Sequence, residues 1–250
     1  YASIIAEATG LVVIYAVIRF KGLHKRFAFF EDIRWDWPMA KHILVKSSPL
    51  IAQFAISIAT WEYFYILVEH HGERSLAISN AMRNIFGLFG IFSWAFASAT
   101  NTMVSNIIGQ GRENEVMGLV MRIVKCSFAF SLLLFFLLNF WPEWFLSFYG
   151  QGEDFIREAI PVVRVVSIAL LMMSFGPVWL NAVTGTGNTR VNLWIEMITL
   201  LVYVVYVYFV LEVYRMPITW GWASEWVYWL SMFSMAYLYM RSGKWRNTQM

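Results

Sequence analysis

The chain has 250 residues, of which 59% are hydrophobic and only 14% are charged, and its mean hydropathy is +0.56. Soluble domains carry about a quarter charged residues, so this composition argues against a soluble enzyme, a disordered tail and a nucleic-acid binder, even with a pI near 9.0. We therefore expect most of the surface to face lipid.

Seven apolar stretches are long enough to cross about 30 Å of hydrocarbon as helices of about 20 residues. They are, in chain order, residues 1–20, 49–69, 84–108, 119–141, 160–182, 191–211 and 219–240. Only helices or closed barrels satisfy the backbone in a bilayer, and a run such as 131–140 is apolar on every side, unlike the alternating strands of a barrel. The sequence predicts an all-α, polytopic membrane protein with seven transmembrane helices.

Basic residues gather on one side of these predicted helices. The connections after the first, third and fifth stretches, with their flanking helix ends and the C-terminal tail, hold fourteen of the 19 Lys and Arg residues. The positive-inside rule makes this side cytoplasmic, so the first stretch runs from outside to inside. Because that orientation requires an odd number of preceding helices if the N-terminus is cytoplasmic, and because the chain opens on Tyr1, we expect an upstream part.

The connection at residues 21–48 is long and mixes aromatic with charged side chains. We predict an interfacial segment here, on the basis of Phe27, Phe29, Phe30, Ile33, Trp35 and Trp37 among Glu31, Asp32, Arg34 and Asp36. Ser48 followed by Pro49 is typical of an N-cap and a first-turn proline. The second membrane helix is therefore predicted to begin there.

Glu62 is the most prominent carboxylate inside a predicted span. It lies thirteen residues after Pro49, or about 20 Å along a helix at 1.5 Å per residue. Ala55 and Ala59 share its face and favour close packing or a cavity wall. An intramembrane carboxylate is costly and is usually functional, so Glu62 is the candidate for exchanging a proton or binding Na⁺; the alternative is a buried structural Glu.

The other charged residues in the spans have simpler interpretations. Arg83, Arg164 and Glu225 lie near the outer ends of their helices, where long side chains reach the headgroups. Glu196 lies six residues after Arg190, which indicates a role at a helix start or at the interface.

Two stretches contain features that suit a transport path. The third is rich in Ser, Thr and Asn, including Asn101, which either join helices or line a wet path. The fifth carries Asn181 and also Pro177, which should kink the helix. Trp61 and Tyr65 could stack on an organic cation, although aromatic residues in membranes more often pack or lie at the interface.

No pattern in the chain indicates catalysis. Gly109-x-Gly111 and Gly185-x-Gly187 lack the third glycine of a nucleotide loop, and His70 and His71 are adjacent, a poor spacing for a helical metal site. The single Cys126 can form no internal disulfide. We expect a protein that is not an enzyme and binds no cofactor.

Two helix-end sequences resemble those in the C-terminal half of multidrug and toxic compound extrusion (MATE) transporters. They are ATNTMVSNIIGQGR at residues 99–112 and NAVTGTGNTRVN at residues 181–192. The Trp61-Glu62-Tyr63 step after Pro49 looks like the acidic position of the family's seventh helix. The resemblance covers essentially all 250 residues.

This resemblance implies a fold of twelve helices in two six-helix lobes around a central cleft. Residues 1–20 would be the last helix of an N-terminal lobe, 21–48 a cytoplasmic or interfacial linker, 49–240 the C-terminal lobe and 241–250 a cytoplasmic tail. The family exchanges H⁺ or Na⁺ for amphipathic, often cationic, compounds by alternating access. Glu62 would be the coupling carboxylate and the possible Na⁺ ligand, and the substrate cleft would include Trp61, Tyr65, Asn101 and Asn181.

One departure concerns the coupling ion. Some sodium-coupled members pair the Glu with an Asp in helix ten, near Phe175 here, and residues 160–190 contain no acid. Proton and sodium coupling therefore both stay open. The resemblance further implies small organic substrates, membrane lipids and an N-terminal lobe as partners, no nucleic acid, and a bacterial inner (plasma) membrane location.

Two other functions remain as alternatives. A flippase for a lipid-linked precursor, from the same superfamily, would need a strongly basic cleft, whereas Lys and Arg here gather at helix ends. A membrane enzyme or a scaffold that does not transport would need reactive side chains within the membrane or an interior without a pocket. A water-filled cleft beside Glu62 would distinguish a transporter from a scaffold.

Overall fold

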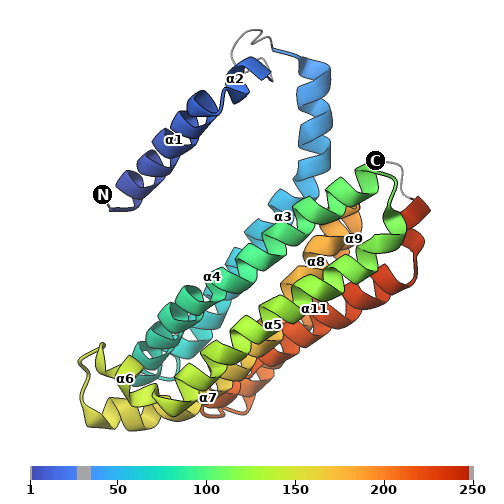
Figure 1. Ribbon diagram of the computed structural model, residues 1–250. Coiled ribbons are helices and arrows are strands. Elements are labelled where there is room, and N and C mark those ends of the chain that lie inside the picture. Colours follow the sequence, from blue (N-terminus) through green and yellow to red (C-terminus); the bar gives the residue numbers. More distant parts are fainter. Residues whose placement is uncertain (1, 27–34, 248–250) are drawn as a thin grey trace. The chain divides into compact units, whose positions relative to one another are not determined.

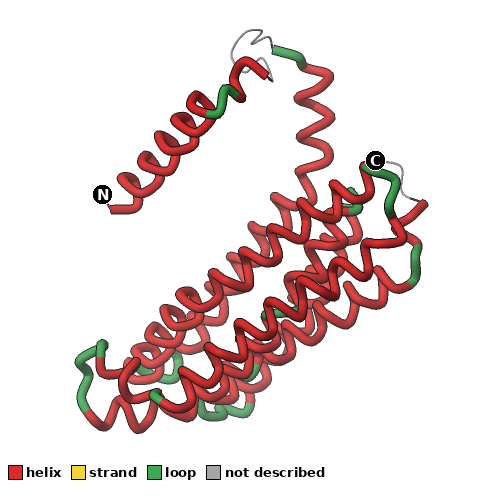
Figure 2. Tube along the Cα trace, in the orientation of Figure 1, coloured by secondary structure: helices red, strands yellow, loops and turns green. Residues whose placement is uncertain are grey.

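The computed structural model describes residues 2–26 and 35–247, and every regular element in these ranges is helical (Figure 2). The chain divides into two units, Tyr1–Val45 and Lys46–Met250. Part of the predicted interfacial segment, namely Phe27, Phe29, Phe30, Ile33 and the charged residues between them, lies outside the described residues.

The first unit contains α1 (Ala2–Phe20), α2 (Leu23–Arg26) and the first turns of α3 (Trp37–Glu69). α1 coincides with the first predicted membrane stretch. Gly22 between α1 and α2 has φ 65°, a conformation that glycine adopts without steric cost. Before α3, the rings of Trp35 and Trp37 stack with centroids 6.3 Å apart.

The second unit is a helical bundle (Figure 1). After α3 its elements are α4 (Glu73–Gly109), η1 (Glu113–Glu115), α5 (Val116–Phe140), α6 (Pro142–Ser147), α7 (Glu153–Met173), α8 (Gly176–Gly185), α9 (Thr189–Val207) with the π-helical turn η2 (Tyr208–Val213), α10 (Ile218–Trp222), α11 (Ser224–Arg241) and η3 (Lys244–Asn247). Long helices of this kind satisfy their own backbone hydrogen bonds, as a bilayer requires.

Four of the predicted membrane stretches are helices long and apolar enough to cross a bilayer. They are Ser47–Glu69, Glu113–Phe140, Glu153–Gly185 and Thr189–Val213. The other three stretches also fall on helices, namely α1, α4, and α10 together with α11. The all-α class is confirmed, whereas the count of seven transmembrane helices stays a prediction.

α4 and α11 form the centre of the bundle. α4 packs on α5, α7 and α8, and α11 packs on α7, α8 and α9. α4 and α8 approach each other closely, since a Cβ on Gly185 would lie 2.9 Å from both the carbonyl oxygen of Asn101 and the Cβ of Val104. Ser105 also donates a hydrogen bond of 3.0 Å to the Gly185 carbonyl. The absence of a side chain at Gly185 therefore sets this crossing.

Two local expectations have different outcomes. The start of a helix at Ser48 and Pro49 is wrong, because α3 begins at Trp37 and Pro49 lies inside it. The kink at Pro177 is confirmed: the helix breaks between Met173 and Gly176, and Pro177, which has no N–H, occupies the first turn of α8. The connection between α5 and α7 contains the short helix α6, at Pro142–Ser147.

Candidate functional site

Two cavities lie side by side within the second unit, and each is lined by one buried carboxyl group. The Glu196 chamber has a volume of about 390 Å³ and the Glu225 chamber a volume of about 210 Å³. Glu196 and Glu225 are only 2% and 3% exposed. α3, α4, α9 and α11 contribute residues to both chambers, and α8 contributes to the Glu196 chamber.

Glu196 is held by hydroxyl groups from two other helices. Its Oε1 accepts a hydrogen bond of 2.8 Å from Ser57 Oγ on α3 and one of 2.5 Å from the Tyr228 hydroxyl on α11. Glu196 lies seven residues after the start of α9 at Thr189, which is about 10 Å along the helix. The carboxyl group therefore joins three helices at a position inside the predicted hydrocarbon layer.

A second polar connection lies one helical turn from Glu196. Asn192 Nδ2 donates to Gln53 Oε1, and Thr184 Oγ1 on α8 donates to Asn192 Oδ1 at 2.9 Å. Gln53 and Ser57 are four residues apart on α3, as Asn192 and Glu196 are on α9, so each pair lies on one helix face. Two parallel polar contacts thus link α3 to α9.

The second oxygen of Glu196 is unsatisfied. Oε2 is buried and makes no hydrogen bond within the described residues. None of the residues that line either chamber is Lys, Arg or His. An ionised carboxylate without a counter-charge is costly in an apolar surrounding, so this carboxyl group has to be neutralised by a proton or by a bound cation.

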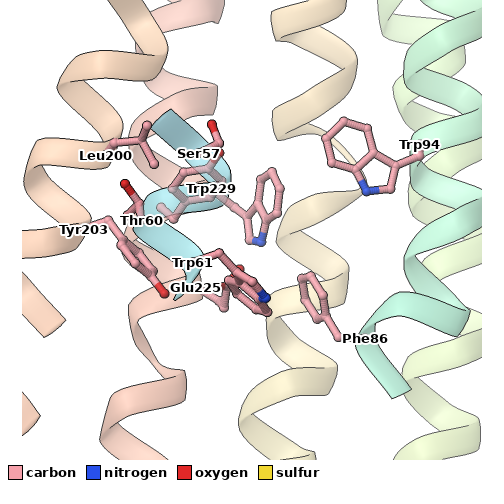
Figure 3. A pocket seen from close by; sticks show the side chains of 10 residues that line it. Ser57, Thr60, Trp61, Phe86, Trp94, Leu200, Tyr203, Glu225 and Trp229 are labelled. Carbon is pink, nitrogen blue, oxygen red and sulfur yellow. The ribbon is translucent and has the colours of Figure 1, made fainter. Parts of the chain in front are cut away.

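The Glu225 chamber has aromatic walls. Figure 3 shows Glu225 beside Trp61, with Tyr203 on one side and Phe86 and Trp94 on the other. The ring centroids of Trp94 and Trp229 are 6.5 Å apart, as are those of Phe86 and Trp229. Glu225 belongs to the first turn of α11, where the helix dipole favours a negative charge. This position gives Glu225 a structural role besides any role in binding.

Polar atoms around the Glu225 chamber also lack partners. The Tyr203 hydroxyl, the Ser224 hydroxyl and the Trp229 indole N–H are buried and make no hydrogen bond of ordinary geometry within the described residues. Buried polar groups in proteins nearly always have a partner. Of these groups, Tyr203 and Trp229 line the chamber together with the Glu225 carboxyl group.

Ser57, Trp94 and Tyr228 separate the chambers, because each of them lines both. The Tyr228 ring contacts Trp229 and Tyr203, with centroid distances of 4.6 and 5.8 Å. Its hydroxyl binds Glu196. Tyr228 therefore contacts the carboxyl group of one chamber and the aromatic wall of the other.

The residues predicted from the sequence fall into two groups. Trp61 lines the Glu225 chamber, and Asn101 and Asn181 line the Glu196 chamber. Glu62 and Tyr65 line neither chamber; Glu62 is exposed, and the Tyr65 hydroxyl donates to the Ser79 carbonyl at 3.2 Å. The role predicted for Glu62 stays a prediction.

Sequence reasoning missed the two buried carboxyl groups. Glu225 was interpreted as reaching the headgroups and Glu196 as lying at a helix start or the interface, whereas both are buried. The available signal was Asn192 one turn before Glu196, opposite Gln53 and Ser57 at the same spacing on another helix. Within the described residues, no three His, Cys, Asp or Glu side chains form a metal-binding group.

Comparison with known proteins identifies the family and the fold of this chain. The MatE family model matches residues 49–209, more than half of the chain. No curated protein matches the sequence.

Several solved structures share the fold. An outward-facing multidrug resistance MATE family transporter of the MOP superfamily superposes with a TM-score of 0.71 at 14% identity, over 81% of this chain and 46% of that one. A MATE protein in complex with MaL6 gives 0.73 at 16% identity, over 88% and 50%. A MOP superfamily transporter from Pyrococcus furiosus Vc1 (DSM3638), described as having a binding pocket of reverse polarity, gives 0.66 at 15% identity, over 78% and 43%. The chain spans about half the length of these proteins.

Proposed function

The chain belongs to the MatE family, and from that premise we propose that it forms the C-terminal lobe of a cation-coupled antiporter that exports amphipathic or cationic organic compounds by alternating access. The observation that carries the proposal is the pair of adjoining chambers, each with one buried carboxyl group and no basic side chain in its lining. The protein is a multi-pass membrane protein. We place it in the bacterial inner membrane, with an N-terminal lobe as its partner.

We propose Glu196 as the coupling carboxyl group, with Glu62 as the alternative predicted from the sequence. Glu196 is buried, lines a cavity and has a free oxygen. Glu62 is exposed in this lobe and lines neither chamber. A coupling group has to alternate between a charged and a neutralised state, and the surroundings of Glu196 make the difference in free energy between those states large.

The proposed coupling ion is the proton rather than Na⁺. Hard cations such as Ca²⁺ and Mg²⁺ take about six or more oxygen ligands, and we expect Na⁺ to require several. The amide oxygens one turn away are already engaged, since Gln53 Oε1 accepts from Asn192 and Asn192 Oδ1 accepts from Thr184. A proton needs only the free Oε2 of Glu196. No other cofactor is proposed.

The proposed substrates are organic cations with an apolar body. The aromatic rings and the carboxyl group of the Glu225 chamber suit a desolvated cation, which gains from both. A flippase for a lipid-linked precursor is not favoured, because an anionic phosphate would need basic residues where the linings supply none.

The test uses the whole gene product that contains these residues, reconstituted in liposomes. Efflux of a fluorescent aromatic cation such as ethidium is driven either by a pH gradient or by a Na⁺ gradient, for the wild type, Glu196→Gln and Glu62→Gln. We expect the pH gradient to drive efflux by the wild type and by Glu62→Gln, and Glu196→Gln to be slower by about tenfold or more.

Three results would contradict parts of the proposal. Full proton-driven efflux by Glu196→Gln would remove Glu196 from the coupling step, and loss of efflux in Glu62→Gln alone would return that role to Glu62. Efflux driven by Na⁺ and not by the pH gradient would exclude the proton as coupling ion.

A further inference from the structure

The Tyr228 hydroxyl donates a hydrogen bond to Glu196, and the strength of this bond depends on whether Glu196 is ionised. Its hydrogen bond to Oε1 is 2.5 Å long, and Ser57 donates to the same oxygen at 2.8 Å. Hydrogen bonds to an ionised acceptor are about twice as strong as those to a neutral one. When Oε2 takes up a proton, the carboxyl group becomes neutral and its hold on Tyr228 weakens.

The Tyr228 ring forms part of the wall of the Glu225 chamber. It packs edge-on against Trp229 at 4.6 Å and against Tyr203 at 5.8 Å, and Trp229 in turn meets Phe86 and Trp94. Tyr228 lies three positions after Glu225 on α11, so the two side chains share a face of the helix. A change in the position of this ring therefore changes the shape of the aromatic chamber.

Few other titratable side chains line the chambers near the hydrogen bond between Tyr228 and Glu196. The titratable side chains in the linings are Glu196 and Tyr203 on α9 and Glu225 and Tyr228 on α11; the lining residues of α3, α4 and α8 are not titratable. Among the described residues that line the Glu225 chamber with Tyr228, the other titratable ones are Tyr203 and Glu225. The charge of Glu196 thus reaches the neighbouring chamber through one direct hydrogen bond.

We propose that Tyr228 is a positioning residue that transmits the protonation state of Glu196 to the Glu225 chamber. With Glu196 ionised, the hydroxyl is held and the ring completes the aromatic wall that receives an organic cation. With Glu196 protonated, the hydroxyl is released, the wall loosens and the affinity for the cation falls. The inference rests on the proposed function, in which Glu196 carries the coupling proton.

The test measures ethidium binding to the purified whole gene product in nanodiscs, by fluorescence anisotropy, at pH 5.5 and pH 8. Protonation and cation binding oppose each other, so Kd is higher at the lower pH, and we expect a wild-type ratio of about fivefold or more. Tyr228→Phe keeps the ring and removes the link. Its Kd at pH 8 should rise toward the wild-type value at pH 5.5, because the hydroxyl is no longer held, so the ratio between the two pH values falls by at least about threefold.

Control variants distinguish loss of the link between Glu196 and the Glu225 chamber from a general disturbance of the protein. Tyr237→Phe changes a tyrosine on the same helix that lines neither chamber, and it should keep the wild-type ratio. Ser57→Ala removes the other donor to Oε1 and leaves Tyr228 in place, so it should keep the ratio too. Glu196→Gln should abolish the difference in Kd between the two pH values. Adding Tyr228→Phe to it should have no further effect on this difference, because both residues belong to the same link.

The outcomes distinguish this inference from the proposed function. A ratio lost in Glu196→Gln and retained in Tyr228→Phe overturns the role of Tyr228 alone. Loss of the ratio in Ser57→Ala, which keeps Tyr228, also overturns it, and this result can be obtained even if Tyr228→Phe does not fold. A wild type without any pH dependence of Kd overturns both.

Discussion

At the scale of single residues, the site depends on a set of polar side chains that hydrogen-bond to one another. Asn192 joins Gln53 on α3 to Thr184 on α8, and it is 2% exposed. Removing Asn192 leaves the Gln53 oxygen without its donor and the Thr184 hydroxyl without its acceptor on α9. Asn101 lines the same chamber, but its side chain makes no hydrogen bond within the described residues.

This difference gives a prediction for stability. Asn192→Leu should lower the free energy of unfolding by about 1–3 kcal/mol for each group it leaves unpaired, whereas Asn101→Leu should have a much smaller effect. Thermal unfolding in detergent, followed by the fraction that remains monodisperse, measures both variants. Equal midpoints for the two variants would show that the contact between Asn192, Gln53 and Thr184 contributes nothing to stability.

At the scale of elements, the chambers exist because α4, α8, α9 and α11 are held in fixed positions around them. The crossing of α4 and α8 is set by Gly185, where an added Cβ would meet backbone and side-chain atoms of Asn101 and Val104 at 2.9 Å. Asn101 and Asn181, which line the Glu196 chamber, belong to these two helices. The close approach of the helices therefore brings the two asparagines to one cavity.

Gly185→Ala should separate α4 from α8. Overpacking of this kind costs about 1–3 kcal/mol, so the thermal midpoint in detergent should fall. Gly118→Ala is the matched control, because Gly118 lies inside α5 with no atom within 4 Å of the added Cβ. The explanation fails if the two variants have the same midpoint.

At the scale of the whole molecule, the connections of the second unit form two groups. The connections around residues 110–115, 186–188 and 242–243 join helices at one end, and those around 70–72, 141–152 and 214–217 join them at the other. The first group carries Arg112, Arg190, Arg241 and Lys244 at or beside it, and the second is rich in acids such as Glu143, Glu153 and Asp154. The positive-inside rule predicts that the first group is cytoplasmic.

Single cysteines test this orientation in intact cells. In the whole gene product with Cys126 replaced by Ala, Gln151→Cys should react with a membrane-impermeant maleimide added outside, and Gln110→Cys should react only after permeabilisation. Both positions are exposed, between helices. The reverse labelling pattern would contradict the orientation and would put the basic end outside.

The sequence anticipated some features and missed others, for reasons that are local in each case. The break at Pro177 was predictable because proline lacks an N–H and cannot continue the hydrogen-bond ladder. Pro49 led to the wrong prediction of a helix start, because the residues before it are helical from Trp37 onward and α3 continues through it. Asn101, Asn181 and Trp61 were predicted as cleft residues and do line the chambers, but Glu62, the carboxyl group singled out by its depth, does not.

The sequence by itself determined that most of the surface faces lipid, that the protein is helical, and which family it resembles. Hydropathy, charge placement and helix-end motifs can all be read from residues that are close together along the chain. The tertiary structure alone decided which carboxyl groups are enclosed. Depth along a helix can be counted from residue numbers, whereas the direction in which a side chain faces depends on the helices that pack against it. Glu196 is buried because Ser57 and Tyr228, 139 and 32 residues away in sequence, meet it from α3 and α11.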